Sequence, residues 1–172
     1  MLCPLDIVPA GPARLEWVTY ADKPGLEIYQ RSASFILNMA VAELFHNTRL
    51  VIGHSISNGF YYDFYCGIPV TQELLNGIIA KMREISGRDL PFRRLLLPRS
   101  EAIRYFAGRS MSDSERLVEN STIDPVQIYE SGRFANLEIY PLAFSSGAVS
   151  RFELKSYSPG FVILFPEQED FT

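Results

Sequence analysis

Few side chains in this sequence have the chemistry that catalysis or metal binding requires. The chain contains two histidines, His46 and His54, and two cysteines, Cys3 and Cys66. Imidazole and thiolate groups are the usual nitrogen and sulfur ligands of zinc, but these four residues form no motif with ligand spacing. We therefore expect no metal site in this chain, and we expect both cysteines to be reduced thiols.

The neighbours His54 and Ser55 could be compared with a general base and its nucleophile. Adjacent residues of an extended segment point to opposite faces, so these two side chains would not cooperate there. We favour a structural role, in which His54 caps the turn beside Asn58 and Gly59. No catalytic residue is assigned from this pair.

Carboxylates are scattered rather than paired. Asp63, Glu138 and Glu153 fall on expected strands, but nothing in the sequence brings two of them together, as general acid–base catalysis requires. The chain lacks a G-x-x-x-x-G-K-[ST] phosphate loop, a G-x-G-x-x-G dinucleotide loop and a G-x-S-x-G nucleophile elbow. We therefore expect no nucleotide cofactor and no serine hydrolase centre in this chain.

Basic residues concentrate in residues 81–116, which hold more than half of the 16 in the chain. With Tyr105 and Phe106 nearby, an arginine-biased surface would suit phosphate and base contacts in RNA. Acidic residues are interleaved with the basic ones, however, so the local excess of positive charge is modest. We favour the alternative, a surface crossed by salt bridges.

The composition fits a folded chain without a membrane span. Hydrophobic residues make up 47% of the 172 residues and aromatic residues 13%, which is enough for a core. A net charge of -4 does not indicate general binding to nucleic acid or membranes. No stretch approaches the roughly 20 apolar residues of a membrane span, and the first residues lack the features of a secretory signal. We expect a cytoplasmic protein.

Helical patterns come early in the chain and strands cluster late. We expect a strand at residues 15–20, a turn at residues 22–25, a helix from Gln30 and a helix capped by Thr71. Shorter helices are expected at residues 100–107 and after Ser112, where the sequence fits a capping box. Strands are expected at residues 60–65, 92–97, 126–129, 134–140, 149–154 and 161–165. This order predicts an α+β fold with a mainly antiparallel sheet and helices packed on one face. Residues 1–28 are expected to be a leader or the remnant strand of a preceding domain, and residues 29–172 one domain.

Three segments, in the same order, resemble motifs of threonyl-tRNA synthetases. Residues 51–64, VIGHSISNGFYYDF, resemble I-G-P-x-x-x-x-G-F-Y-Y-D-F. Residues 31–41, RSASFILNMAV, resemble H-S-x-A-H-L-L-x-x-A-V, and residues 129–137, YESGRFANL, resemble Y-x-x-G-x-F-x-D-L. The likeness spans about residue 15 to the C-terminus. It implies the editing-type domain that accompanies these synthetases and recurs in alanyl-tRNA synthetases.

The same resemblance implies that the editing chemistry is missing. Function in that family depends on two histidines of the H-x-x-x-H helix and on a C-x-x-x-H pair after the D-L strand. The histidines of the helix correspond to Arg31 and Phe35, and the cysteine and last histidine correspond to Glu138 and Leu142. Because arginine, phenylalanine, glutamate and leucine cannot reproduce a cluster that poises a water, we expect no catalytic residue. Arg31 and Glu138 are expected to form an ion pair instead.

A second resemblance is to the N-terminal region of bacterial uridine kinase-like proteins, which continue into a P-loop kinase domain. It rests on residues 29–35, His54 with Ser55, residues 89–92, residues 145–147 and the pairs Pro159-Gly160 and Phe165-Pro166. It implies a fusion to a C-terminal kinase domain, with ATP and Mg²⁺ bound only there. This chain stops where that domain would begin.

We therefore expect a catalytically silent accessory domain that binds a nucleoside or a tRNA end. The residues expected to line its cleft are Arg31, Phe35, His54, Tyr61, Tyr62, Glu138 and Leu142. Two alternatives stay open. One is an aminoacyl-tRNA deacylase in which Arg31 holds the substrate and His54 is the base. The other is a purely structural module without a ligand.

Overall fold

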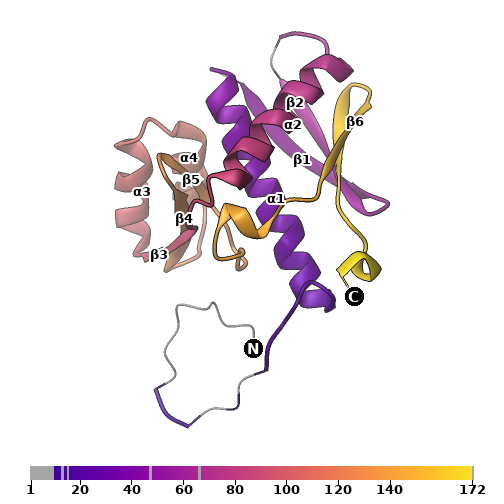
Figure 1. The fold of residues 1–172 in the computed structure, drawn as a ribbon. Coiled ribbons are helices and arrows are strands. Elements are labelled where there is room, and N and C mark those ends of the chain that lie inside the picture. Colours follow the sequence, from indigo (N-terminus) through magenta and orange to yellow (C-terminus); the bar gives the residue numbers. More distant parts are fainter. Residues whose placement is uncertain (1–9, 13, 15, 47, 66, 172) are drawn as a thin grey trace. The chain divides into compact units, whose positions relative to one another are not determined.

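The computed structural model describes residues 10–12, 14, 16–46, 48–65 and 67–171 (Figure 1). The predictions for Cys3 and Cys66 therefore lie outside the described residues, as does Leu15. The chain divides into two compact units. The first unit comprises Met1–Leu90 and Leu142–Thr172, and the second unit comprises Pro91–Pro141. The prediction of one domain over residues 29–172 stays a prediction.

A long helix, α1 (Lys23–Leu44), begins earlier than the sequence pattern predicts. Residues 22–25 were expected to form a turn, but Asp22 is the N-cap and Pro24 lies in the first helical turn. Proline fits there because the first N–H groups of a helix have no intrahelical partner. The Asp22 carboxylate accepts a hydrogen bond from the Thr19 N–H at 2.8 Å. The strand expected at residues 15–20 is wrong for residues 16–20, which belong to no strand.

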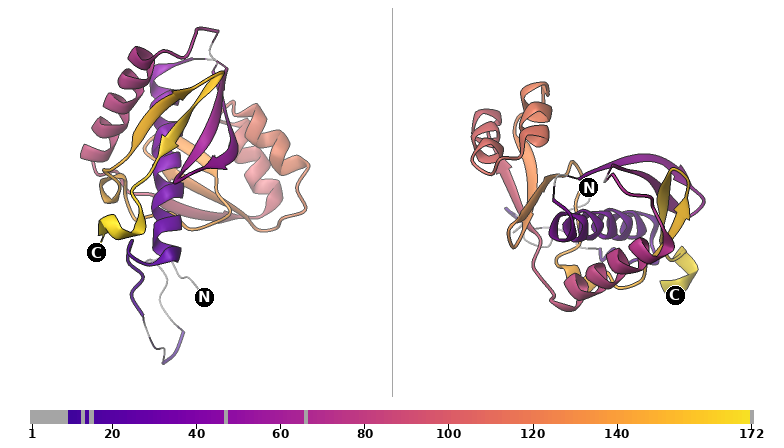
Figure 2. Two further views of the ribbon diagram at one scale, coloured as in Figure 1. Left: turned by 90° about the vertical axis from the view of Figure 1, so that its right-hand side faces the viewer. Right: turned by 90° about the horizontal axis from the view of Figure 1, so that it is seen from above.

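The first unit contains an antiparallel four-stranded sheet in the order β1-β2-β7-β6. Its strands are β1 (Arg49–Ile56), β2 (Gly59–Tyr65), β6 (Glu153–Tyr157) and β7 (Gly160–Leu164). Helix α2 (Gln72–Gly87) starts at Thr71, whose hydroxyl accepts a hydrogen bond from the Leu74 N–H at 3.2 Å, so this N-cap is confirmed. Helices α1 and α2 lie on the same side of the sheet (Figure 2). The opposite face is the outer face.

Alternation along β2 decides which side chains reach the core of the first unit. Tyr62 and Phe64 are buried, and both rings lie against Phe161 of β7. Phe45, directly after α1, meets the ring of Phe64 edge-on. Because side chains of a strand alternate between its faces, Tyr61 and Asp63 belong to the outer face of the sheet.

The second unit has its own sheet and its own core. Strands β3 (Arg93–Leu97), β4 (Val126–Ser131) and β5 (Phe134–Leu137) pair antiparallel in the order β3-β4-β5. Helices α3 (Arg99–Ala107) and α4 (Ser112–Glu119) supply Ala102, Phe106 and Val118 to its core. The capping box at Ser112 is wrong, because the N-cap is Met111 and no side chain caps this helix.

The α+β fold class is confirmed, with antiparallel sheets and helices on one side of the first of them. Two sheets are present where one was expected. Two short 3₁₀ helices, η1 (Ser146–Ala148) and η2 (Gln168–Phe171), complete the first unit. Within the part of the chain that the structure describes, no helix combines the length and apolar character that crossing a membrane demands.

Ser146 connects the end of α2 with η1. Its hydroxyl donates to the Ile85 carbonyl at 2.7 Å and accepts from the Leu90 N–H at 2.9 Å, and the residue is completely buried. The neighbouring Asp89 carboxylate accepts hydrogen bonds from the Ser145 hydroxyl and from the Gly147 N–H. The Asp89-Leu90 and Ser145-Ser146-Gly147 segments thus form one hydrogen-bonded connection within the first unit.

Replacing Ser146 with alanine is expected to lower the free energy of unfolding by about 1–3 kcal/mol. It removes the hydroxyl that accepts from the Leu90 N–H, and it removes one of the two donors to the Ile85 carbonyl, which keeps the Arg88 N–H at 3.2 Å. Urea unfolding followed by circular dichroism measures this change. The exposed Ser150 in the same loop is the matched control, and Ser150→Ala should change stability by less than about 0.5 kcal/mol. Equal effects of the two substitutions would contradict the role assigned to Ser146.

Candidate functional site

Helix α1 carries two of the positions that the synthetase resemblance assigns to editing. Arg31 is partly exposed and forms a salt bridge with Glu27, one turn earlier, at 2.9 Å. Phe35 is 0% exposed and belongs to the core. The two side chains therefore differ in environment although they stand one turn apart, and only Arg31 could meet a ligand from solvent.

The segment that follows the second unit approaches α1 through a residue that the sequence did not single out. The Ser32 hydroxyl donates to the Ile28 carbonyl at 2.7 Å and accepts from the Ala143 N–H at 2.7 Å. Leu142, the position assigned to the last editing histidine, precedes Ala143 and is 7% exposed. Phe35 and Leu142 were predicted to line a cleft. Both are buried apolar residues, and their place in a cleft stays a prediction.

Tyr29 makes a second connection of this kind. Its hydroxyl donates to the Arg151 carbonyl at 2.9 Å and lies 2.7 Å from the Arg151 N–H, which donates to it. Burial raises the pKa of Tyr29, because the ionised phenolate would be poorly solvated there. These contacts connect the first turns of α1 with the segment that precedes β6.

Glu138 lies in the second unit, just beyond the end of β5. Its carboxylate accepts a hydrogen bond from the Asn136 side chain at 3.3 Å, and its backbone carbonyl accepts one from the Gln127 side chain at 2.8 Å. Arg31 belongs to the first unit and Glu138 to the second. Their ion pair therefore stays a prediction.

The structure brings two further candidates together on the outer face of the first unit's sheet. The ring centroids of His54 on β1 and Tyr61 on β2 are 5.5 Å apart, with the rings tilted by 31°. The Tyr61 hydroxyl donates to the Asp63 carboxylate at 2.7 Å, which raises the pKa of Tyr61 because ionisation would remove the donor. His54 therefore contacts a ring within the sheet rather than the turn at Asn58, which corrects the expected capping role.

Two further tyrosines differ from what the sequence predicted: Tyr62 was named as a site residue and Tyr157 was not. Tyr62 was expected to line a cleft, but it is 2% exposed and stacks on Phe161 in the core. Tyr157 on β6 was not predicted, although its ring centroid is 5.8 Å from that of Tyr61. The alternation of residues 153–157 gave a signal that could have placed Tyr157 on the outer face. Nothing in the sequence shows that β6 lies beyond β7, on the far side from β2.

The basic segment of residues 81–116 is crossed by salt bridges, as favoured from the sequence. Lys81 pairs with Glu84 at 2.6 Å, and Arg109 pairs with Glu130 at 3.0 Å. Arg109 also covers the ring of Tyr105 at 3.7 Å. Burial, with the hydrogen bond that Tyr105 donates to Glu130, raises the pKa of Tyr105. Tyr105 and Arg109 thus serve the internal structure of the second unit.

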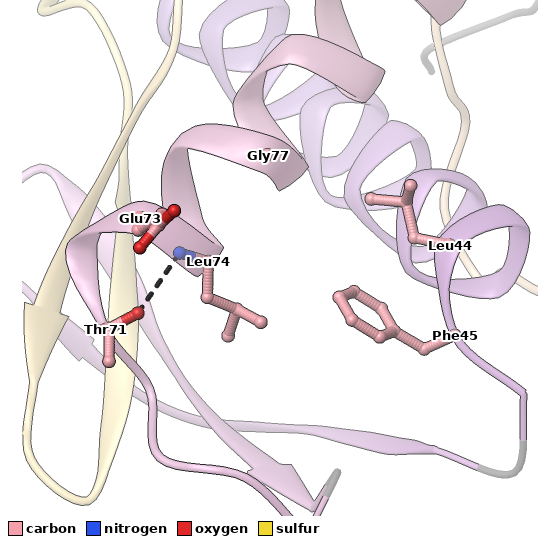
Figure 3. Close-up of a pocket in the computed structure, with 6 residues that line it drawn as sticks. All are labelled: Leu44, Phe45, Thr71, Glu73, Leu74 and Gly77. Atoms are coloured by element: carbon pink, nitrogen blue, oxygen red, sulfur yellow. Dashed lines mark hydrogen bonds between the residues drawn. The ribbon is translucent and has the colours of Figure 1, made fainter.

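A pocket of about 370 Å³ lies between the end of α1 and the start of α2 (Figure 3). The residues that line it are Leu44, Phe45, Thr71, Glu73, Leu74 and Gly77. The Thr71 hydroxyl is engaged as the cap of α2, so Glu73 supplies the one charged group of the lining. None of the predicted cleft residues lines this pocket, and its lining shows no catalytic arrangement.

Metal binding finds no support among the described residues, which contain no group of three histidine, cysteine, aspartate or glutamate side chains arranged around one point. Cys3 and Cys66 lie outside them, so the expectation of no metal site stays a prediction. What the first unit does present is a ring surface on the outer face of its sheet and an arginine on α1. Neither arrangement provides a nucleophile with an adjacent base.

Comparison with known proteins places these observations in a family context. No family model matches the chain. A threonine–tRNA ligase of Granulibacter bethesdensis is 38% identical over 141 residues, which is 81% of this chain and 22% of the ligase. The threonine–tRNA ligase of Methylibium petroleiphilum is 38% identical over 145 residues, and that of Desulfovibrio desulfuricans is 40% identical over 131 residues. The chain is homologous to part of these threonine–tRNA ligases.

The shared part is small relative to the ligases. The chain spans about a fifth of the length of the relatives it matches. Threonyl-tRNA synthetase is another name for these ligases. The resemblance to threonyl-tRNA synthetases is therefore confirmed for the part of the ligases that the chain matches. These relatives lend no support to the link with uridine kinase-like proteins.

Proposed function

We propose that this chain is an editing-type module related to the threonine–tRNA ligases that has lost hydrolysis and binds an RNA end without cleaving it. The observation that carries the proposal is the complete burial of Phe35, at a position that the resemblance assigns to an editing histidine. A phenyl group in the core has no atom that could bind a metal or poise a water. Leu142 is also buried and stands at another position that the resemblance assigns to an editing histidine, and its side chain cannot bind a metal or poise a water either.

The alternative of an active deacylase, with Arg31 as the binding residue and His54 as the base, has weaker support. Arg31 lies on α1, which packs against the inner face of the sheet, whereas His54 contacts Tyr61 on the outer face. A base and a binding residue for one scissile bond have to meet at the same substrate. His54 lies on the face of the sheet that is turned away from α1, and this opposes that arrangement.

A deacylation assay tests the loss of hydrolysis. Incubated with mischarged threonine-specific tRNA, the full chain is expected to release the amino acid no faster than buffer does. The homologous region of the Granulibacter bethesdensis ligase, expressed separately and assayed beside it, serves as the comparison. Hydrolysis by this chain above the buffer rate would overturn the proposal, and its loss in the His54→Ala variant would then favour the deacylase alternative.

We also propose a relation to uridine kinase-like proteins, which rests on the motifs at residues 29–35, 89–92 and 145–147. In that case ATP and Mg²⁺ would bind in a kinase domain beyond this chain, and the module would act within a cytoplasmic nucleoside kinase. The mass of the polypeptide made by its own cell tests this. A mass well above 19.5 kDa together with ATP-dependent phosphorylation of uridine would support the relation. A mass near that of this chain would refute it.

A further inference from the structure

The outer face of the first unit's sheet presents three rings in a row, which we call the aromatic row: His54 on β1, Tyr61 on β2 and Tyr157 on β6. Tyr61 stands in the middle, 5.5 Å from His54 and 5.8 Å from Tyr157 between ring centroids. In the left view of Figure 2 the sheet faces the viewer with α1 behind it, and among the described residues no helix of the first unit covers the face turned to the viewer.

Two glycines make room for the central ring. A Cβ on Gly53 would lie 2.8 Å from Cδ1 of Tyr61, and a Cβ on Gly160 would lie 2.9 Å from the Tyr61 hydroxyl. Gly160 pairs with Tyr157 across β7 and β6, so the two tyrosines approach over a position without a side chain. With its hydroxyl bound to Asp63, Tyr61 is held in place and is 7% exposed.

The outer two rings remain accessible. Tyr157 is 53% exposed, and His54 is exposed as well. The central ring therefore acts as the support. The rings of His54 and Tyr157 are turned by 31° and 70° from the plane of Tyr61, so each offers its own face to a planar group. Aromatic rings bind bases of single-stranded nucleic acid in this way, and a four-stranded sheet with rings on its open face is one fold that does so.

The charges on this face decide what kind of nucleic-acid contact is possible. Lys155 lies 3.5 Å from Glu153 and pairs with it, and the Asp63 carboxylate is held by Tyr61. Arg49 at the start of β1 is the remaining positive charge on this face of the described strands, and the formal charges of Arg49, Lys155, Asp63 and Glu153 cancel. Such a surface does not attract a phosphate backbone. It suits an uncharged base, and the ring nitrogens of His54 are available to hydrogen-bond to the edge of that base.

We propose that the aromatic row stacks an unpaired base of single-stranded RNA. The inference rests on the proposed function, since it names the surface by which the module would hold an RNA end. It also separates that surface from α1, where the resemblance places two of the four editing positions, Arg31 and Phe35. Stacking supplies the affinity, so binding depends on the rings and only weakly on salt.

Fluorescence anisotropy with a 5′-labelled hexamer of adenylate tests the proposal on the full chain. Binding is expected to weaken about tenfold or more in Tyr157→Leu and in His54→Leu, because stacking on an aromatic ring contributes about 1–3 kcal/mol per base. Raising the salt from 50 to 200 mM should change the affinity by less than about threefold. A protein with many phosphate contacts would lose about a thousandfold or more.

Tyr140→Leu is the matched control, because Tyr140 is similarly exposed, at 57%, but lies in the second unit. It should bind the hexamer as the unchanged chain does, and a labelled adenylate–uridylate duplex should not bind. Absence of hexamer binding, or equal binding by the Tyr157→Leu variant, would overturn the inference. If binding is instead lost in Arg31→Ala and kept in Tyr157→Leu, the proposed RNA-end function survives and the aromatic row is the wrong surface.

Discussion

Replacing Phe35 with histidine is expected to lower the free energy of unfolding by about 3 kcal/mol. The side chain is 0% exposed, so the substitution removes a buried phenyl group and places an imidazole where its nitrogens are shielded from water. Removal of a buried aromatic group costs about 3–5 kcal/mol when nothing replaces it, and a buried polar group without partners costs about 1–3 kcal/mol. The imidazole refills part of the space, which keeps the sum near the lower figure.

Urea unfolding followed by circular dichroism gives the free energy, and hydrogen exchange of the α1 amides assigns the loss to the first unit. Phe35→Leu is the control that keeps the site apolar, and it should cost less than about 1.5 kcal/mol. Because Arg31, Glu138 and Leu142 remain, the histidine is not expected to restore deacylation. A Phe35→His variant as stable as the unchanged chain would show that this position tolerates a polar group and would remove the main support for the proposed function.

Replacing Gly160 with alanine is expected to prevent β2 and β7 from pairing as they do. The added Cβ would lie 1.9 Å from the Tyr62 carbonyl oxygen, a backbone atom that cannot rotate away. Relief requires a shift of one of two hydrogen-bonded strands in the middle of the sheet. We expect a loss of about 3 kcal/mol or more in the free energy of unfolding, at or above the usual range for overfilled cores.

The same substitution at Gly77 is the control, because outside the neighbouring backbone of its own helix no atom lies within 4 Å of the position where its Cβ would stand. Gly77 lies in the interior of α2, where alanine is favoured over glycine by about 1 kcal/mol. Gly77→Ala should therefore raise the melting temperature while Gly160→Ala lowers it. Melting curves of the two variants that move in the same direction would contradict the packing described here.

The sequence predicted the fold class and the helix at Thr71 because those features depend on local patterns. Apolar spacing and a capping hydroxyl act over a few residues, and both are visible along the chain. The start of α1 was missed because residues 22–25 fit a turn as well as a capped helix, and only contacts with the rest of the first unit choose between them. The division into two sheets follows from long-range pairing, such as that of β2 with β7, which no local pattern reports.

The candidate site was predicted in part for the same reason. His54 and Tyr61 were named from a motif, and the structure brings their rings together across neighbouring strands. Tyr62 was named from the same motif, but strand alternation turns it to the opposite face. Phe35 and Leu142 were placed in a cleft by correspondence with family positions. Their apolar side chains are buried, because burial of a hydrophobic group stabilises the fold while an exposed one gains nothing.

The two units differ in how they can form during synthesis. The second unit is one uninterrupted stretch, Pro91–Pro141, whereas the first is built from stretches on either side of it. On the ribosome the second unit can complete its core early, while β2 keeps an open edge until β7 has emerged. Until then the apolar faces of α1 and of the β1–β2 hairpin lie exposed to other chains. A released chain truncated between residues 141 and 160 would thus contain a complete second unit together with a half-sheet prone to aggregation.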